Sequence, residues 1–240
     1  MVKNFVCLAI ILFINGRSEA QPAASDTSSG AILHPVAVYY QTLGEQSPLY
    51  NGREYVDYAG TIHVGHPFYS TTEFTNGTIY FDGMVFENVM LLYDIIKDKV
   101  LIRHYNTVFR IDMPVKKINE FTLLNHTFVR LLPDSARVIE EGFYDKLYQG
   151  KNTLFVKRKK LIREERAGND LSNVVDEKNI FYILKQGIYY PVKNLRGLLN
   201  ILSGRREQIQ QYLKKNGIKF RKDREKAILM AVEYYDRLSN

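Results

Sequence analysis

Apolar and polar residues alternate between Thr78 and Arg130, and this pattern predicts a ladder of short β-strands. The clearest example is Thr107–Met113, in which Phe109, Ile111 and Met113 fall on the opposite side from the charged residues between them. A strand that buries one face requires this alternation, because successive side chains point to opposite sides of a sheet. We therefore expect an antiparallel sheet at the centre of the fold.

Turn residues separate the apolar runs of this region. Asp82-Gly83 and Lys97-Asp98-Lys99 each stand between two apolar runs, and both predict tight hairpins. Asn76-Gly77 is a strong hairpin signal as well, and it predicts a turn immediately before the central strands.

The chain between Phe143 and Pro191 predicts two more hairpins, with turns at Gln149–Asn152 and Gln186-Gly187. Between these hairpins, the polar segment Glu164–Glu177 predicts an exposed loop.

After Pro191 the apolar period changes from two residues to about three and a half, which predicts helices. The first follows Asn194 as a possible N-cap and ends before Gly204, the second ends at Asn216-Gly217, and the third starts near Asp223. Three short amphipathic helices are not stable alone, so we expect them to pack on the sheet. The predicted fold class is α+β: a mostly antiparallel, multi-hairpin sheet in residues 32–191, followed by a cluster of three short helices in a basic region, residues 192–240.

The N-terminus has the three parts of a secretory signal peptide. Met1–Asn4 carries a positive charge, Phe5–Ile14 is an apolar run too short to span a membrane, and Ser18-Glu19-Ala20 supplies small residues for cleavage. We expect residues 1–20 to be removed after Ala20, and residues 21–31 to form a flexible leader. The alternative, a buried N-terminal helix, is weakened because the small polar residues that follow offer it nothing to pack on. The expected location is periplasmic or extracellular.

The single cysteine, Cys7, lies inside this signal, so the expected mature chain has none. Disulfides, thiolate catalysis and cysteine metal sites are then excluded. A secreted protein without disulfides is more typical of a bacterial envelope than of a eukaryotic extracellular space.

No catalytic or cofactor motif stands out. His63 and His66 form the closest histidine pair, but their spacing in a strand-rich region places them on opposite faces, and no nearby glutamate completes a metalloprotease motif. Ser70 lacks a nucleophile elbow, and no glycine-rich phosphate loop is present. We therefore expect no metal and no cofactor, and we favour a binding protein over an enzyme. A hydrolase whose site is assembled from distant residues stays open.

Basic residues are the most distinctive feature of the composition. The chain has 33 Lys and Arg against 26 Asp and Glu, a net charge of +7, and residues 193–240 hold twelve of the basic residues against five acidic ones. Such a surface suits an anionic polysaccharide, lipid head groups or an envelope protein. A solvated face that only keeps the protein soluble is the simpler alternative. The predicted binding residues are Lys157, Arg158, Lys159, Lys160, Arg163, Lys214 and Lys215.

The helical region also has some character of a helix-turn-helix, but export argues against nucleic acid as a partner. Several expected strands are apolar on both sides, among them Val89–Tyr93 and the strand around Phe155. Either helices cover the second face, or the sheet curls around a cavity that carries a lipid-like ligand.

Three stretches resemble a broad group of uncharacterised secreted proteins from Gram-negative environmental bacteria. They are Val89–Asp94, Gly142–Lys151 and the closing basic helices with Tyr212–Asn216 and Tyr234-Tyr235. The resemblance implies a β-rich fold and an envelope or secreted location, and it transfers no functional residue. Together with the composition, it favours a non-enzymatic protein that binds or scaffolds in the cell envelope.

Overall fold

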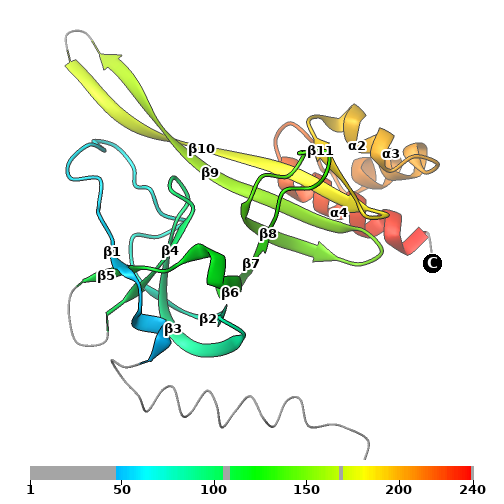
Figure 1. The fold of residues 1–240 in the computed structure, drawn as a ribbon. Helices are drawn as coiled ribbons and strands as arrows, with labels where there is room; N and C mark the ends of the chain where they lie inside the picture. The colour runs from blue at the N-terminus through cyan, green and yellow to red at the C-terminus, as the bar shows by residue number, and fades with distance from the viewer. Residues whose placement is uncertain (1–46, 105–108, 168–169, 239–240) are drawn as a thin grey trace, which may run out of the picture.

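The computed structural model describes residues 47–104, 109–167 and 170–238, which form one antiparallel sheet and three C-terminal helices (Figure 1). The sheet has eleven strands in the order β1-β5-β4-β3-β2-β6-β7-β8-β9-β10-β11. This is the expected α+β architecture. The strands are β1 (Arg53–Glu54), β2 (Thr75–Phe81), β3 (Met84–Asp94), β4 (Lys99–Arg103), β5 (Arg110–Asp112), β6 (Ile118–Leu123), β7 (His126–Leu131), β8 (Gly142–Gln149), β9 (Thr153–Ala167), β10 (Asp170–Lys185) and β11 (Ile188–Val192).

The helices are α2 (Leu195–Ile201), α3 (Arg206–Lys215) and α4 (Arg224–Leu238), and short 3-10 turns occur at Pro48–Tyr50 and Val115–Lys117. The N-cap of α2 is the expected one, because the Asn194 side chain accepts a hydrogen bond from the Gly197 amide. Among the described residues, none of the helices has the length and apolar character needed to cross a membrane. The predicted signal peptide and leader lie outside the described residues.

Several of the turns that join neighbouring strands lie where the sequence predicts them. Asp82 and Gly83 both have positive φ values, 53° and 82°, and connect β2 to β3 in a two-residue hairpin. Asp98, also at positive φ, lies in the connection from β3 to β4, and Gln186-Gly187 connects β10 to β11.

Asn76-Gly77 is not a turn, and that prediction is wrong. Both residues lie inside β2, next to a register shift between Gly77 and Ile79 that marks a bulge. A side chain at Gly77 would meet the backbone oxygen of Thr122 at 2.1 Å and the Leu91 side chain at 2.7 Å. Glycine is needed here because two neighbouring strands approach closely, not because the chain reverses.

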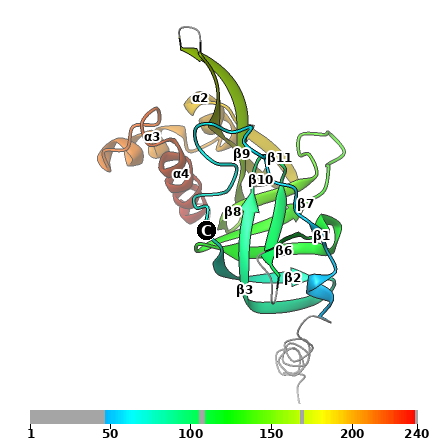
Figure 2. The same ribbon diagram turned by 90° about the vertical axis from the view of Figure 1, so that its left-hand side faces the viewer.

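The segment Glu164–Glu177 is also not a loop. It forms the outer part of β9 and β10, which pair from Thr153↔Leu184 as far as Ala167↔Asp170. The long hairpin projects away from the rest of the sheet (Figures 1 and 2). Its polar composition reflects the exposure of most of its side chains.

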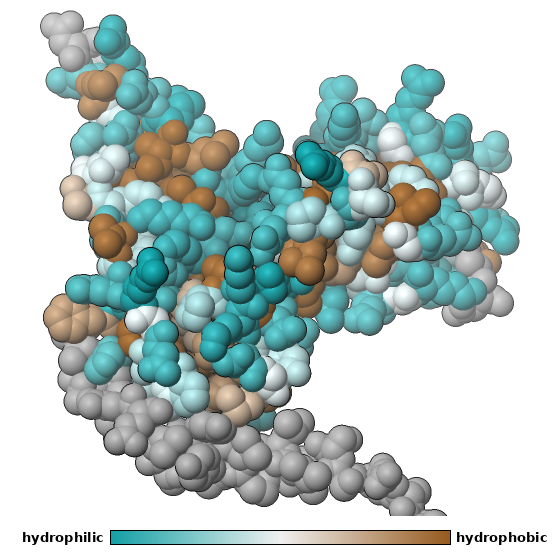
Figure 3. All heavy atoms as spheres, in the orientation of Figure 1, coloured by the Kyte–Doolittle hydropathy of each residue, from teal (hydrophilic) through white to brown (hydrophobic). Residues whose placement is uncertain are grey.

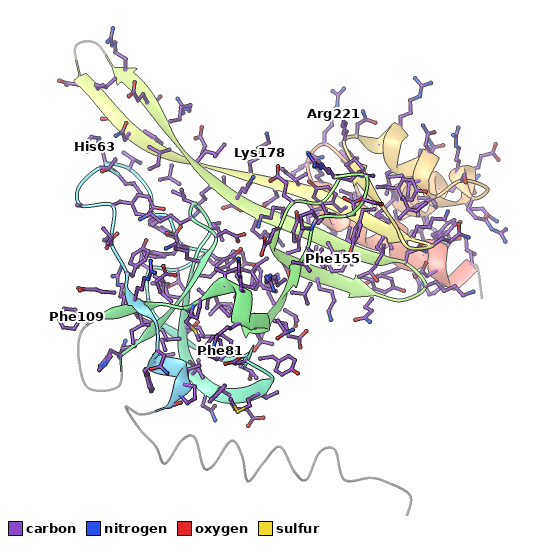
Figure 4. All side chains as sticks on the ribbon, viewed as in Figure 1. His63, Phe81, Phe109, Phe155, Lys178 and Arg221 are labelled. Carbon is purple, nitrogen blue, oxygen red and sulfur yellow. The ribbon has the colours of Figure 1, made fainter. Side chains whose placement is uncertain are left out.

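The N-terminal part of the sheet curls around an aromatic core. The ring centroids of Tyr93 on β3 and Phe143 on β8 are 6.0 Å apart, although three strands lie between β3 and β8 in the sheet order. Across a flat sheet four strand spacings amount to about 19 Å. The curl brings these strands face to face, and Phe121 and Phe128 stack inside at 5.0 Å. The interior is therefore filled with side chains, as Figure 4 shows around Phe81.

A second core lies between the helices and the other end of the sheet. Leu154, Val156 and Phe181 from the sheet pack with apolar residues of all three helices, including Leu198 and Ile228. The helices thus pack on the sheet, as expected.

Strands that are apolar on both sides are covered on both sides. Leu92 and Leu101 face outward and are covered by Tyr55 and Phe68, from the segment before β2. Phe155 packs with Ile139, from the connection between β7 and β8.

The alternation predicted for Thr107–Met113 holds in part. Ile111 and Met113 are buried, but Phe109 is 54% exposed and projects from the edge of the curled sheet (Figure 4). Thr107 and Val108 lie outside the described residues.

Candidate functional site

The predicted basic run on β9 does not form one exposed surface. Because successive side chains of a strand point to opposite faces, Arg158 and Lys160 face the helical side and Lys157 faces the other side. The exposed fractions of Lys157, Arg158 and Lys160 are only 5%, 5% and 8%. These three cations lie in the interior and are held by hydrogen bonds.

Arg158 is the centre of a buried ion network between the two cores. Its Nε and Nη2 donate to Asp145 Oδ2 at 3.0 and 2.7 Å, and its Nη1 and Nη2 donate to the two Glu225 oxygens at 2.5 and 3.0 Å. His126 Nδ1 lies 2.8 Å from the same Asp145 oxygen. Burial lowers the pKa of Arg158, but the hydrogen bonds to Glu225 and Asp145 more than offset this and raise the pKa above its ordinary value.

The network connects α4 to the sheet, since Glu225 lies in the first turn of that helix. Asp145 is fully buried, and its Oδ1 has no hydrogen-bond partner among the described residues. The charge of Asp145 is therefore balanced mainly through one oxygen. Without Arg158 this buried carboxylate would lose its main counter-charge.

The other two buried cations join separate parts of the curl. Lys157 Nζ donates to Asp98 Oδ2 at 2.6 Å and to the Phe143 carbonyl at 3.1 Å, so it connects β9 to the turn after β3. Lys160 Nζ donates to the carbonyl oxygens of His66 and Phe68 at 3.1 and 2.6 Å. Burial lowers the pKa of both lysines, and Asp98 partly compensates at Lys157. Their surroundings are those of structural cations.

Asp94 fastens the segment before β2 in a similar way. The hydroxyls of Tyr55 and Tyr58 donate to Asp94 Oδ2 at 2.8 and 3.0 Å, and the amides of Ile96 and Lys97 donate to its Oδ1. Burial first, and then Asp94, raises the pKa of both tyrosines. This buried carboxylate is fully occupied by hydrogen bonds and is not a free acid or base.

The remaining residues of the predicted surface are more exposed but are spread over the molecule. Lys159 lies 3.5 Å from Glu140, and Arg163 on the projecting hairpin pairs with Asp176 at 2.6 Å. Lys214 and Lys215 are exposed in the last turn of α3, where cations interact favourably with the helix dipole. The structure therefore does not bring the seven predicted residues together.

The two histidines considered for metal binding have different surroundings. His63 Nδ1 accepts a hydrogen bond from the Asn173 amide at 2.8 Å, beside the projecting hairpin (Figure 4). The His66 ring stacks on Phe68, and burial together with nearby Lys160 lowers its pKa. Within the described part of the chain, no three His, Cys, Asp or Glu side chains come together as a metal site.

A basic groove lies in the helical region. Its volume is about 770 Å³, and it lies between the start of α2 and the connection from α3 to α4. Lys193, Arg196, Lys219 and Arg221 line it and are exposed. In the described ranges none of the four has a carboxylate within ion-pair distance. We call these four residues the groove cations.

Arg224 holds the two sides of the groove together. Its Nη2 donates to the carbonyls of Val192 and Lys193 at 2.8 and 3.2 Å, and its guanidinium lies over the Phe181 ring. Leu195 and Phe220 also line the groove and pack against the helical core with their buried sides. The groove thus combines positive charge with a partly exposed apolar floor, on a framework fixed by hydrogen bonds.

The groove cations contribute to the positive charge counted in residues 193–240, but the sequence does not single them out. Lys193 and Arg196 are 23 or more residues away from Lys219 and Arg221 along the chain. Only the packing of the start of α2 beside the connection from α3 to α4 brings the two pairs to one groove. The closely spaced Lys219, Arg221 and Lys222, next to an aromatic residue, were the available signal.

No family model, curated protein or solved structure matches the chain, so the resemblance to secreted bacterial proteins and the expected location stay predictions.

Proposed function

We propose that the protein is a secreted, non-enzymatic binding protein of a bacterial cell envelope, and that it contacts an anionic envelope component through the groove cations. The observation that carries the proposal is the set of exposed positive charges at one groove with no carboxylate partner in the described chain. Like charges held near one another are unfavourable unless an anion or solvent screens them, so such a cluster favours an anionic ligand.

Two other features support a binding role rather than catalysis. The buried carboxylates Asp94 and Asp145 are engaged by hydrogen bonds from tyrosines or Arg158, so neither is placed as a general acid or base at an open cleft. The curled sheet is filled by aromatic rings, which disfavours the alternative of a lipid-like ligand enclosed within the curl.

The proposal is tested by retention on immobilised heparin as a model polyanion. The groove variant replaces all four groove cations with Ala. A matched control replaces two arginines and two lysines that are exposed elsewhere, on the sheet or on the 3-10 turn before β6: Arg53, Arg103, Lys116 and Lys178. Both variants lose the same formal charge, so any difference in retention reports position and not net charge.

We expect the groove variant to elute at clearly lower salt than the native protein, and the control to elute close to it. A third variant, Lys214→Ala with Lys215→Ala, measures whether the end of α3 extends the same surface. Equal elution of the groove and control variants would mean that only bulk charge acts, and the proposal would be rejected.

A further inference from the structure

The groove in the helical region is lined by apolar as well as basic side chains. Leu195 and Phe220 are partly exposed between the groove cations. None of the eight residues that line the groove is acidic. Figure 3 shows the same mixture in the helical region, where hydrophobic residues lie scattered among hydrophilic ones.

Such a mixture distinguishes between two kinds of anionic ligand. A polysaccharide presents charged and hydroxyl groups along its whole length, and it has little apolar surface that could pack against an aliphatic leucine. An anionic phospholipid presents a phosphate directly above the first methylenes of its acyl chains, so a surface with cations around an apolar centre matches both parts.

We infer that the groove docks on a membrane surface of anionic phospholipids, with the groove cations at the head-group phosphates and with Phe220 and Leu195 at the first acyl methylenes. The inference rests on the proposed function and names its ligand class. The partial exposure of Phe220 suits shallow contact at the interface, because its other side packs in the helical core.

The framework of the groove suits such contact. Arg224 connects the start of α4 to the end of β11 through the carbonyls of Val192 and Lys193, so the two sides of the groove keep their separation. A surface that is already ordered loses less conformational entropy on binding.

The absence of tryptophan from the chain permits a direct test. The Phe220→Trp variant carries a single fluorescent indole at the groove, and the Tyr80→Trp variant carries one on β2, at a partly exposed site far from the helices along the chain. Each is titrated with vesicles of phosphatidylglycerol and phosphatidylcholine, and with phosphatidylcholine vesicles alone. For the Phe220→Trp variant we expect a blue shift of emission, and quenching by brominated acyl chains, with the anionic vesicles only. The Tyr80→Trp variant should show neither.

Binding of variants separates this inference from the proposed function. Each cation near an anionic membrane contributes about fivefold in affinity, so removing the four groove cations should lower vesicle binding by nearly three orders of magnitude. Phe220→Ser should weaken vesicle binding about tenfold and leave heparin retention unchanged. Phe220→Leu, which keeps the apolar packing, serves as the control for folding, and thermal unfolding of both variants is compared with that of the native protein.

If Phe220→Ser binds vesicles as well as the native protein, or if the indole of the Phe220→Trp variant stays in water on anionic vesicles, the membrane inference is overturned. Heparin retention that still depends on the groove cations would then leave the proposed function in place, with a polysaccharide as the ligand.

Discussion

Removing the charge of Asp145, which is fully buried, should destabilise the fold strongly. Asp145→Asn keeps the shape of the side chain but leaves the buried Arg158 with only Glu225 as a counter-charge, and the Glu225 side chain is 39% exposed. Breaking a buried ion pair by removing one partner costs about 3–5 kcal/mol. Because Glu225 remains, we expect the lower end, about 3 kcal/mol.

Equilibrium unfolding in urea measures this loss as a shift of the midpoint, and calorimetry measures it as a lower melting temperature. For a chain of this size, about 3 kcal/mol corresponds to a decrease of about 6–12 °C. Glu225→Gln is the matched comparison, because it removes the other counter-charge of Arg158, at a more exposed position. We expect this variant to lose about 1 kcal/mol or less. Asp82→Asn, at an exposed pair with Lys117, should have almost no effect.

A double-mutant cycle distinguishes a loss of stability caused by the broken ion pair from a loss that any substitution in the core would cause. Combining Asp145→Leu with Arg158→Met removes both charges, and the loss for the pair should be smaller than the sum of the two single losses. The reasoning is refuted if Asp145→Asn unfolds within about 1 kcal/mol of the native protein, or if the two single losses simply add.

Three further outcomes are expected. Burial raises the pKa of several tyrosine hydroxyls, including that of Tyr69 to about 12; above about pH 10 the unfolded chain therefore holds fewer protons than the native state, and stability falls as pH rises. Absorbance at 295 nm should then show ionisation of these tyrosines together with unfolding, and independent titration near pH 10 would contradict this. Gly77→Ala should destabilise the fold by about 2–3 kcal/mol, because its Cβ would meet the backbone of a neighbouring strand. Gly83→Ala has open space around it and should lose about 1 kcal/mol through its positive φ alone. Urea unfolding measures both losses. Mass spectrometry of exported protein should find Gln21 at the N-terminus, and mature material that begins at Met1 would reject the signal peptide.

Local patterns predicted those elements whose cause is local. The hairpin at Asp82-Gly83 follows from the backbone freedom of these two residues, and the N-cap of α2 follows from the side chain of Asn194. The change from a period of two to a period of three and a half after Pro191 is equally local, because it reflects which side chains share a face. These features need no knowledge of the rest of the chain.

The wrong predictions took composition as evidence for a turn or a loop. Asn76-Gly77 has the composition of a turn, but the approach of Leu91 and of the Thr122 backbone requires glycine within a strand. Glu164–Glu177 has the composition of a loop, but it forms the outer part of the β9–β10 hairpin, where most side chains are exposed. A turn-like or polar composition therefore does not by itself distinguish a strand from a turn or a loop.

The sequence by itself determined that this chain forms an antiparallel sheet followed by basic helices, because strand and helix periods and turn residues act over a few positions. Only the tertiary structure decided which of the many cations are exposed on the surface, where a ligand can reach them. The curl of the sheet and the packing of α4 bury Arg158 and Lys160 inside, while the packing of α2 beside the connection between α3 and α4 collects the groove cations on the surface. A buried cation such as Arg158 pairs with a carboxylate tens of residues away in the sequence, in this case Glu225. Short-range sequence patterns contain no information about such a pairing.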